Sequence, residues 1–252
     1  MSGSLLFTHF ARPNHDPFPQ SAPWHLTWLT ERNLGYHRSL VESRRTPPPD
    51  ALLSLQDCNL SPRPRNTSDD AAVAEAEAII ALVPDLYNIV RQRVRGFAVI
   101  SSPGPDYDTS HSAPAWPGWI FVSIPEIGPR RAVRLAESVI HEAMHHNLTA
   151  LEQRVMLARP NHTAYSPWKH ETRAASGVLH GLYVFVCLAA YFHQILTVRT
   201  IVADAARDRI ATILEEVESI DRARLEAALS EPGVRICQAL YDAANLIRSV
   251  HG

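Results

Sequence analysis

The residues of this 252-residue chain with the clearest chemical meaning are His141 and His145, four positions apart, with Glu142 between them. Residues four apart on an α-helix lie on the same face, so the two imidazole rings can bind one divalent cation. The HExxH pattern is short and also arises by chance, and two ordinary polar residues on a half-buried helix are the alternative. The elements that would position these side chains are therefore important.

The segment from about Pro129 to about Met156 has the pattern of an amphipathic helix. Pro129 suits the first helical turn, where its missing N–H is not needed. Apolar residues recur at helical spacing and predict a buried stripe: Val133, Ala136, Val139, Ile140, Ala143 and Met144. Four other residues form a row along the flank: His141, His145, Leu148 and Glu152. His146 points about 100° away from this row and is left outside the metal site.

A third histidine lies in the run from Val178 to Leu196, which is apolar enough to suggest a membrane span. The run contains His180, His193 and Gln194 and has no flanking charge pattern, so it predicts a helix buried at the centre of a soluble domain. A buried polar group without a partner costs roughly 1–3 kcal/mol. His180 could meet this need by bonding a carbonyl oxygen, or it could be a third metal ligand.

An HExxH helix is typical of zinc peptidases, in which a third residue completes the site and the glutamate activates water. The extended motif HExxHxxGxxH requires glycine at 148 and histidine at 151, where this chain has Leu148 and Leu151. Glu152 and Glu171 are possible carboxylate ligands, but neither lies in a second helical motif. His180 is the better placed third ligand.

Two cations precede His180 in the sequence. They are Lys169, which is the only lysine of the chain, and Arg173. Cations near an open metal site suit an anionic co-substrate, whose distal carboxylate an arginine can bind through two hydrogen bonds. A peptidase has less need of such a group. Taken singly, each residue is better explained as a surface cation.

Two short segments rich in β-branched and aromatic residues, 97–100 and 119–124, predict strands that pair. The polar loop between them is too long for a tight hairpin, and loops of this length are often functional. Because the loop ends one element before the metal-binding helix, four polar residues could lie at the rim of the site: Asp108, Ser110, His111 and Ser112. Solvated loop positions are the alternative.

The remaining segments predict further helices. Residues 24–44 can form one, residues 70–93 a second that is capped by Ser68 or Asp69 and interrupted by Pro84, and residues 201–252 two more, broken near Ser230. We therefore expect a mainly α fold with a small β-hairpin or sheet. Residues 1–68 would form an N-terminal lid or docking segment, and residues 69–252 a helical metal-binding catalytic domain in which the HExxH helix packs on the buried central helix.

Composition limits the possible partners. The net charge of −2 and the absence of a sustained basic run give no footprint for nucleic acid or an anionic membrane surface. The three cysteines are widely spaced and lack a CxxC pattern, which argues against a disulfide framework and a cysteine-based zinc site. No signal-peptide pattern is seen at the N-terminus. These features favour a cytoplasmic protein and leave the oligomeric state open.

Together these motifs resemble the HExxH-type, 2-oxoglutarate-dependent peptide β-hydroxylases, bacterial proteins associated with gene clusters for ribosomally made peptides. The resemblance covers about residues 70–195. It rests on HEAMH at 141–145, SPWK at 166–169, Arg173, and SGVLHG at 176–181 followed by Phe185. Lys169 stands where arginine is more common in the family, and Ala174 where proline is common.

The resemblance implies that His141, His145 and His180 bind Fe(II). It also implies that Arg173, together with Lys169, holds the distal carboxylate of the co-substrate 2-oxoglutarate. Dioxygen would then serve to hydroxylate the β-carbon of a residue in a precursor peptide.

Glu142, assigned to the catalytic site, has no obligatory role as a base in this chemistry. We expect it to contact the metal ligands or the pocket, or to be a ligand itself. Ser110, His111 and Trp168 are assigned to substrate contacts. A zinc metallopeptidase is the alternative function, and a non-catalytic peptide-binding protein is a third.

Overall fold

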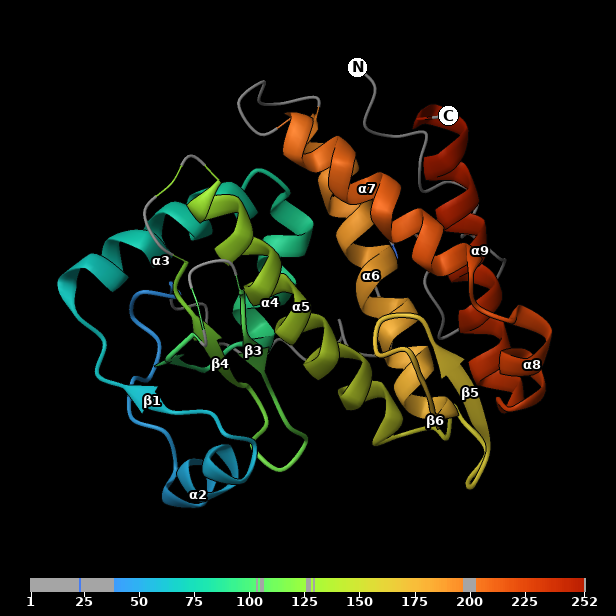
Figure 1. The fold of residues 1–252 in the computed structure, drawn as a ribbon, viewed down its shortest axis with the longest axis horizontal. Helices are drawn as coiled ribbons and strands as arrows, with labels where there is room; N and C mark the ends of the chain where they lie inside the picture. Colours follow the sequence, from blue (N-terminus) through green and yellow to red (C-terminus); the bar gives the residue numbers. More distant parts are fainter. Residues whose placement is uncertain are drawn as a thin grey trace. The chain divides into compact units, whose positions relative to one another are not determined.

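The computed structural model describes residue 23 and residues 39–102, 104, 107–125, 128, 130–196 and 203–251. Helices make up most of this described chain, together with a four-stranded sheet and a separate two-stranded sheet (Figure 1). The expected mainly α fold with a small sheet is confirmed. The chain divides into two compact units, residues 34–146 and residues 1–33 with 147–252.

The unit of residues 34–146 contains the four-stranded sheet, with strand order β1-β2-β4-β3. β2 (Gly96–Ile100) pairs in parallel with β4 (Trp119–Ser123), which confirms that the two predicted strands pair. β1 (Pro62–Arg63) runs antiparallel to β2, and β3 (Ser110–His111) runs antiparallel to β4. The segment expected as a polar loop therefore contributes an edge strand. Every residue of β2 and β4 is buried, as is common for parallel strands.

Two helices, α3 (Thr67–Ile80) and α4 (Pro84–Arg93), occupy the region predicted as one interrupted helix. Pro84 lies in the first turn of α4, because proline cannot donate the hydrogen bond that would continue α3. The predicted cap at Ser68 or Asp69 was wrong. Asn66 is the N-cap: its side chain accepts from the N–H of Asp69 at 2.9 Å, and the Asp69 carboxylate accepts from the N–H of Asn66.

The N-terminal part departs further from expectation. The helix α2 (Pro49–Asp57) was not expected; it has a proline in its first turn, where the missing N–H is not needed. Most of the predicted helix 24–44 lies outside the described residues. Its described end, residues 39–44, forms turns and a β-bridge from Arg44 to Gly96 instead of a helix.

The predicted HExxH helix is α5 (Arg131–Glu152). Pro129 lies outside the described residues, and the helix ends before Met156 because turns follow, with the N–H of Arg154 bonded to the carbonyl of Leu151. The predicted apolar stripe is buried throughout: Val133, Ala136, Val139, Ile140, Ala143 and Met144. Periodicity therefore predicted correctly which face of α5 is buried.

The other unit is built around α6 (Ala175–Leu196), beside which α7 (Ala203–Glu218) and α9 (Glu231–His251) lie in Figure 1. α6 is long and apolar enough to cross a membrane, but 72% of its most apolar window is buried in the structure, as in the core helix of a globular unit. The C-terminal segment holds a short helix, α8 (Arg222–Ala227), between α7 and α9, where two helices were expected. β5 (Thr163–Ser166) and β6 (Glu171–Ala174) form an antiparallel ribbon.

Candidate metal centre

His141 and His145 lie one turn apart on α5, and their Nε2 atoms are 3.2 Å apart. Imidazole nitrogens bind a divalent metal such as zinc at about 2.0–2.1 Å, so two of them at a tetrahedral or octahedral angle lie roughly 3 Å apart. The observed separation fits a shared cation. It equally fits one ring N–H donating to the other ring. Both side chains are half-buried beside the covered stripe of the helix.

His146, the next residue, turns to the sheet. Its Nε2 lies 2.9 Å from the carbonyl oxygen of Trp119 in β4. Burial lowers the pKa of His146, so the neutral ring is favoured and donates its N–H to that carbonyl. This hydrogen bond fixes α5 against β4 without using either histidine of the metal pair.

Glu142 is 4% exposed, and both of its carboxylate oxygens accept hydrogen bonds from serine hydroxyls. Ser110 donates to Oε1 at 2.6 Å, and Ser112 donates to Oε2. Residues two apart in an extended chain share a face, which is why both serines reach the carboxylate. His111, between them, has its ring 6.3 Å from that of Phe121. The HExxH glutamate is therefore held by the β3 segment.

Residues next to β3 hold this strand against α5 and β4 through an ion pair and hydrogen bonds. Asp108 forms an ion pair of 2.7 Å with Arg134 in the first turns of α5. The backbone N–H of Thr109 donates to the hydroxyl of Ser123 at 2.8 Å, and the N–H of Ser123 donates back to the Thr109 carbonyl. The predicted nearness of this segment to the HExxH helix is thus seen for Asp108, Ser110 and Ser112. The sequence feature that indicated this segment was its polar residues at alternate positions. The sequence analysis did not identify Glu142 as the partner of the two serines.

His180 lies on α6, in the unit that includes residues 147–252. Its Nε2 is 2.7 Å from Oε2 of Glu152, at the end of α5. The side chains are 15% and 27% exposed, so this bond is mostly shielded from water. Within the described residues, no group of three or more His, Cys, Asp or Glu side chains is gathered as a metal site. The three-histidine centre stays a prediction.

Trp168 packs on α6. Its ring stacks on that of Phe185 with a centroid distance of 4.8 Å, and its Nε1–H donates to Glu216 at 3.0 Å. A Cβ at Gly181 would come within 2.5 Å of the indole, so a glycine is needed there. The SPW and GVLHG motifs therefore meet through this contact. The predicted substrate role of Trp168 stays a prediction.

Lys169 and Arg173 are both exposed on the β5–β6 ribbon. Arg173 forms an ion pair of 3.3 Å with Glu171, in which the side chains are 45% and 60% exposed. Exposed ion pairs contribute about 0–1 kcal/mol, so Arg173 can exchange Glu171 for another carboxylate at little cost. Their binding of a co-substrate carboxylate stays a prediction.

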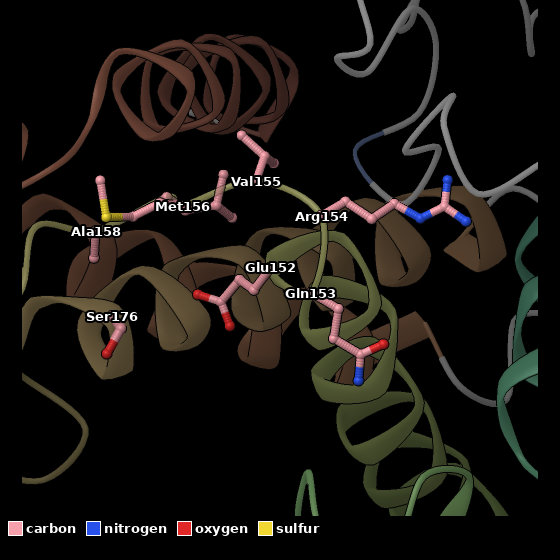
Figure 2. Close-up of a pocket in the computed structure, with 8 residues that line it drawn as sticks. Glu152, Gln153, Arg154, Val155, Met156, Ala158 and Ser176 are labelled. Atoms are coloured by element: carbon pink, nitrogen blue, oxygen red, sulfur yellow. The ribbon is translucent and has the colours of Figure 1, made fainter.

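An open hollow of about 430 Å³ lies near the end of α5 and the start of α6. Eight residues line it: Glu152, Gln153, Arg154, Val155, Met156, Leu157, Ala158 and Ser176. Figure 2 shows the side chain of Arg154 extending away from Glu152, Met156 and Ser176. Glu152 therefore both lines this hollow and contacts His180.

Comparison with models of known protein families gave no match for the chain, and no curated protein matched it either. Membership of the peptide β-hydroxylases therefore stays a prediction from the motifs. The function proposed below is argued from the side chains themselves and from that resemblance.

Proposed function

We propose that the chain is an Fe(II)- and 2-oxoglutarate-dependent oxygenase that hydroxylates the β-carbon of a residue in a ribosomally made peptide. The observation that carries the proposal is the arrangement on α5, where two Nε2 atoms lie 3.2 Å apart and the glutamate between them is held by two serines. His141 and His145 are two of the metal ligands, and His180 is the third.

Three protein ligands leave coordination positions open for a co-substrate and dioxygen. When bound, the iron supplies the oxidation: 2-oxoglutarate and dioxygen give succinate and carbon dioxide, and the remaining oxygen atom enters a C–H bond of the peptide. The chain's own residues bind the co-substrate and orient it. Arg173, whose exposed pairing with Glu171 is weak, takes the distal carboxylate of 2-oxoglutarate, with Lys169 nearby in sequence.

The hydrogen bonds of Glu142 favour this reading over a zinc peptidase. In a peptidase the same carboxylate takes a proton from metal-bound water, so it has to face the metal. Here both oxygens are engaged by Ser110 and Ser112. An oxygenase needs no base at this position, and a buried glutamate can serve to hold α5 and β3 together.

The test is anaerobic incubation of the full chain with Fe(II) and 2-oxoglutarate, and then with a ribosomally made precursor peptide. A keto acid chelated to Fe(II) gives a metal-to-ligand charge-transfer absorption band, which should appear before oxygen is admitted. After oxygen, mass spectrometry should show one added oxygen atom in the peptide, with release of succinate.

His141→Ala and His145→Ala should each abolish the absorption band and the products. The matched control is His170→Asn, because His170 is exposed with φ of 52°, a conformation that asparagine tolerates. Peptide cleavage supported by zinc, with no succinate formed under iron, would overturn the proposal in favour of a peptidase.

A further inference from the structure

The open hollow beside Glu152 has the charge and the lining of a site for a basic side chain. We infer that it binds an arginine or lysine residue of an extended peptide, with the Glu152 carboxylate as the anion and Ala158 as the backbone contact. The inference goes beyond the proposed function, because it needs no metal and names the chemistry of the peptide. All the lining residues belong to the unit that includes residues 147–252.

The charge inside the hollow is negative. Of the lining residues, Glu152 and Arg154 are charged. In Figure 2 the Glu152 carboxylate points to the side on which Met156 and Ser176 lie, and Arg154 extends to the other side. The contact of 2.7 Å with His180 holds this carboxylate in place. An anionic ligand would be repelled here, whereas a guanidinium or ammonium group would form a charge-assisted hydrogen bond.

The wall of the hollow suits the stem of such a side chain. Met156 is 59% exposed, and together with Val155 and Leu157 it gives the hollow an apolar side. Arginine and lysine have a chain of methylene groups that covers apolar surface while the charged head meets a polar group. Methionine adapts to the groups that it contacts, because its side chain is unbranched. The lining therefore fits both parts of a basic side chain.

The backbone at Ala158 can pair with an extended peptide. Ala158 forms an antiparallel bridge to Leu229, and the two hydrogen bonds of this bridge, both of 2.9 Å, are made by the residues on either side of the pair. In such a pair the N–H and C=O groups of Ala158 itself point away from Leu229. No described residue forms a hydrogen bond with either group. A peptide can therefore bind along this edge in the way of an added strand.

The segment that carries Ala158 is held in place before a ligand binds. The hydroxyl of Ser230 donates to the carbonyl of Met156 at 2.5 Å. A Cβ at Gly233 would come within 1.9 Å of the carbonyl oxygen of Leu157, so the first turn of α9 lies directly against this segment. A preformed wall lowers the cost of ordering on binding.

The experiment follows the methionine methyl groups of the full chain by NMR, with EDTA present so that no metal contributes. The chain has three methionines, and loss of a signal in Met156→Leu assigns Met156. The probes are acetyl-Ala-Ala-Arg-Ala-Ala-amide and its lysine, glutamine and glutamate counterparts. The arginine and lysine probes should shift the Met156 signal saturably and bind about tenfold more tightly than the glutamine probe. The glutamate probe should bind more weakly still.

Glu152→Gln removes the charge and keeps an oxygen that accepts from His180. This variant should bind the arginine probe about tenfold more weakly and lose the preference over the glutamine probe. The matched control is Glu215→Gln, which makes the same change at an exposed position on α7 and should bind like the wild type. Thermal unfolding shows that each variant is folded before its affinity is compared.

Equal affinity for the arginine and glutamine probes, or unchanged affinity in folded Glu152→Gln, would overturn the basic ligand. Agmatine, which has the guanidinium group of arginine without peptide groups, should bind about tenfold more weakly than the arginine probe, because the backbone hydrogen bonds are lost. If agmatine binds as tightly as the peptide, the pairing at Ala158 is wrong. Failure of the oxygenase proposal would leave these results unchanged, because they are obtained without metal.

Discussion

The hydroxyl of Ser110 lies 2.6 Å from Oε1 of Glu142, so a strand residue holds the second residue of the HExxH pattern. Ser110→Ala should lower the free energy of unfolding by about 1–3 kcal/mol, because a buried carboxylate loses a partner. Urea denaturation measures this loss. Ser249→Ala, which removes an exposed hydroxyl on α9, is the control and should change little. Equal stability of the two variants would contradict the importance of the serine pair.

Glu142→Gln separates the two enzyme readings. The amide keeps an oxygen that accepts from one serine, and its NH₂ group can donate to the other, so the variant should fold and keep its metal. Under the oxygenase proposal, succinate formation should remain within about tenfold of wild type, since loss of a general base typically costs 10²–10⁴-fold. A loss of that larger size in a folded, metal-loaded variant would indicate that Glu142 acts as a base.

Two glycines of α6 offer a matched pair. A Cβ at Gly181 would lie 2.5 Å from the Trp168 ring, whereas one at Gly177 would meet nothing within 4 Å. Gly181→Ala should therefore destabilise the protein by about 1–3 kcal/mol through overpacking. Gly177→Ala should be neutral or stabilise by up to about 1 kcal/mol, because alanine favours the helix. Thermal unfolding and tryptophan fluorescence report both effects, and identical behaviour would refute the packing role.

His193 and His251 predict a dependence of stability on pH. Nδ1 of His193 lies 2.6 Å from Nε2 of His251, at the ends of α6 and α9. Burial lowers the pKa of both rings, and each ring also has a repulsive neighbour, His251 for His193 and Arg207 for His251. The unfolded chain therefore binds protons more readily, so the stabilisation is present above about pH 6.5 and is lost as pH falls through the folded pKa values.

His251→Gln should remove this part of the pH dependence. Urea unfolding of the variant and the wild type at pH 8 and pH 5 isolates the contribution of this histidine pair, because all other histidines are the same in both proteins. The difference in unfolding free energy between the two pH values should be smaller in the variant. Equal differences in both proteins would show that the pair does not contribute.

Local patterns predicted the parts of the fold that depend on neighbouring residues. The apolar spacing of α5 and α6 and the β-branched segments at β2 and β4 correspond to observed elements. Asn66 was missed as a cap because Ser68 and Asp69 are equally good cap residues by type. The break before α8 was missed because Asp221 caps a helix too short to show periodicity.

The contacts of the candidate site were harder to predict, because they join distant parts of the sequence. Ser110 and Ser112 were expected near the HExxH helix, but nothing in their spacing identifies Glu142 as their partner. Glu152 was considered as a ligand, whereas its contact with His180 depends on how α5 and α6 pack. Motifs identify the residue types, and tertiary packing decides which of them meet.

The pairing of β3 with β4 places Ser110 opposite Val122 and His111 opposite Phe121. A shift of this pairing by one residue would turn both serines away from Glu142 and bring the imidazole toward it, because side chains alternate along a strand. The buried carboxylate would then lose two hydroxyl donors at about 1–3 kcal/mol each. A shifted register of this two-residue strand is therefore less stable than the observed one, because it lacks the hydrogen bonds to Glu142. The HExxH carboxylate thus helps to fix how β3 pairs with β4.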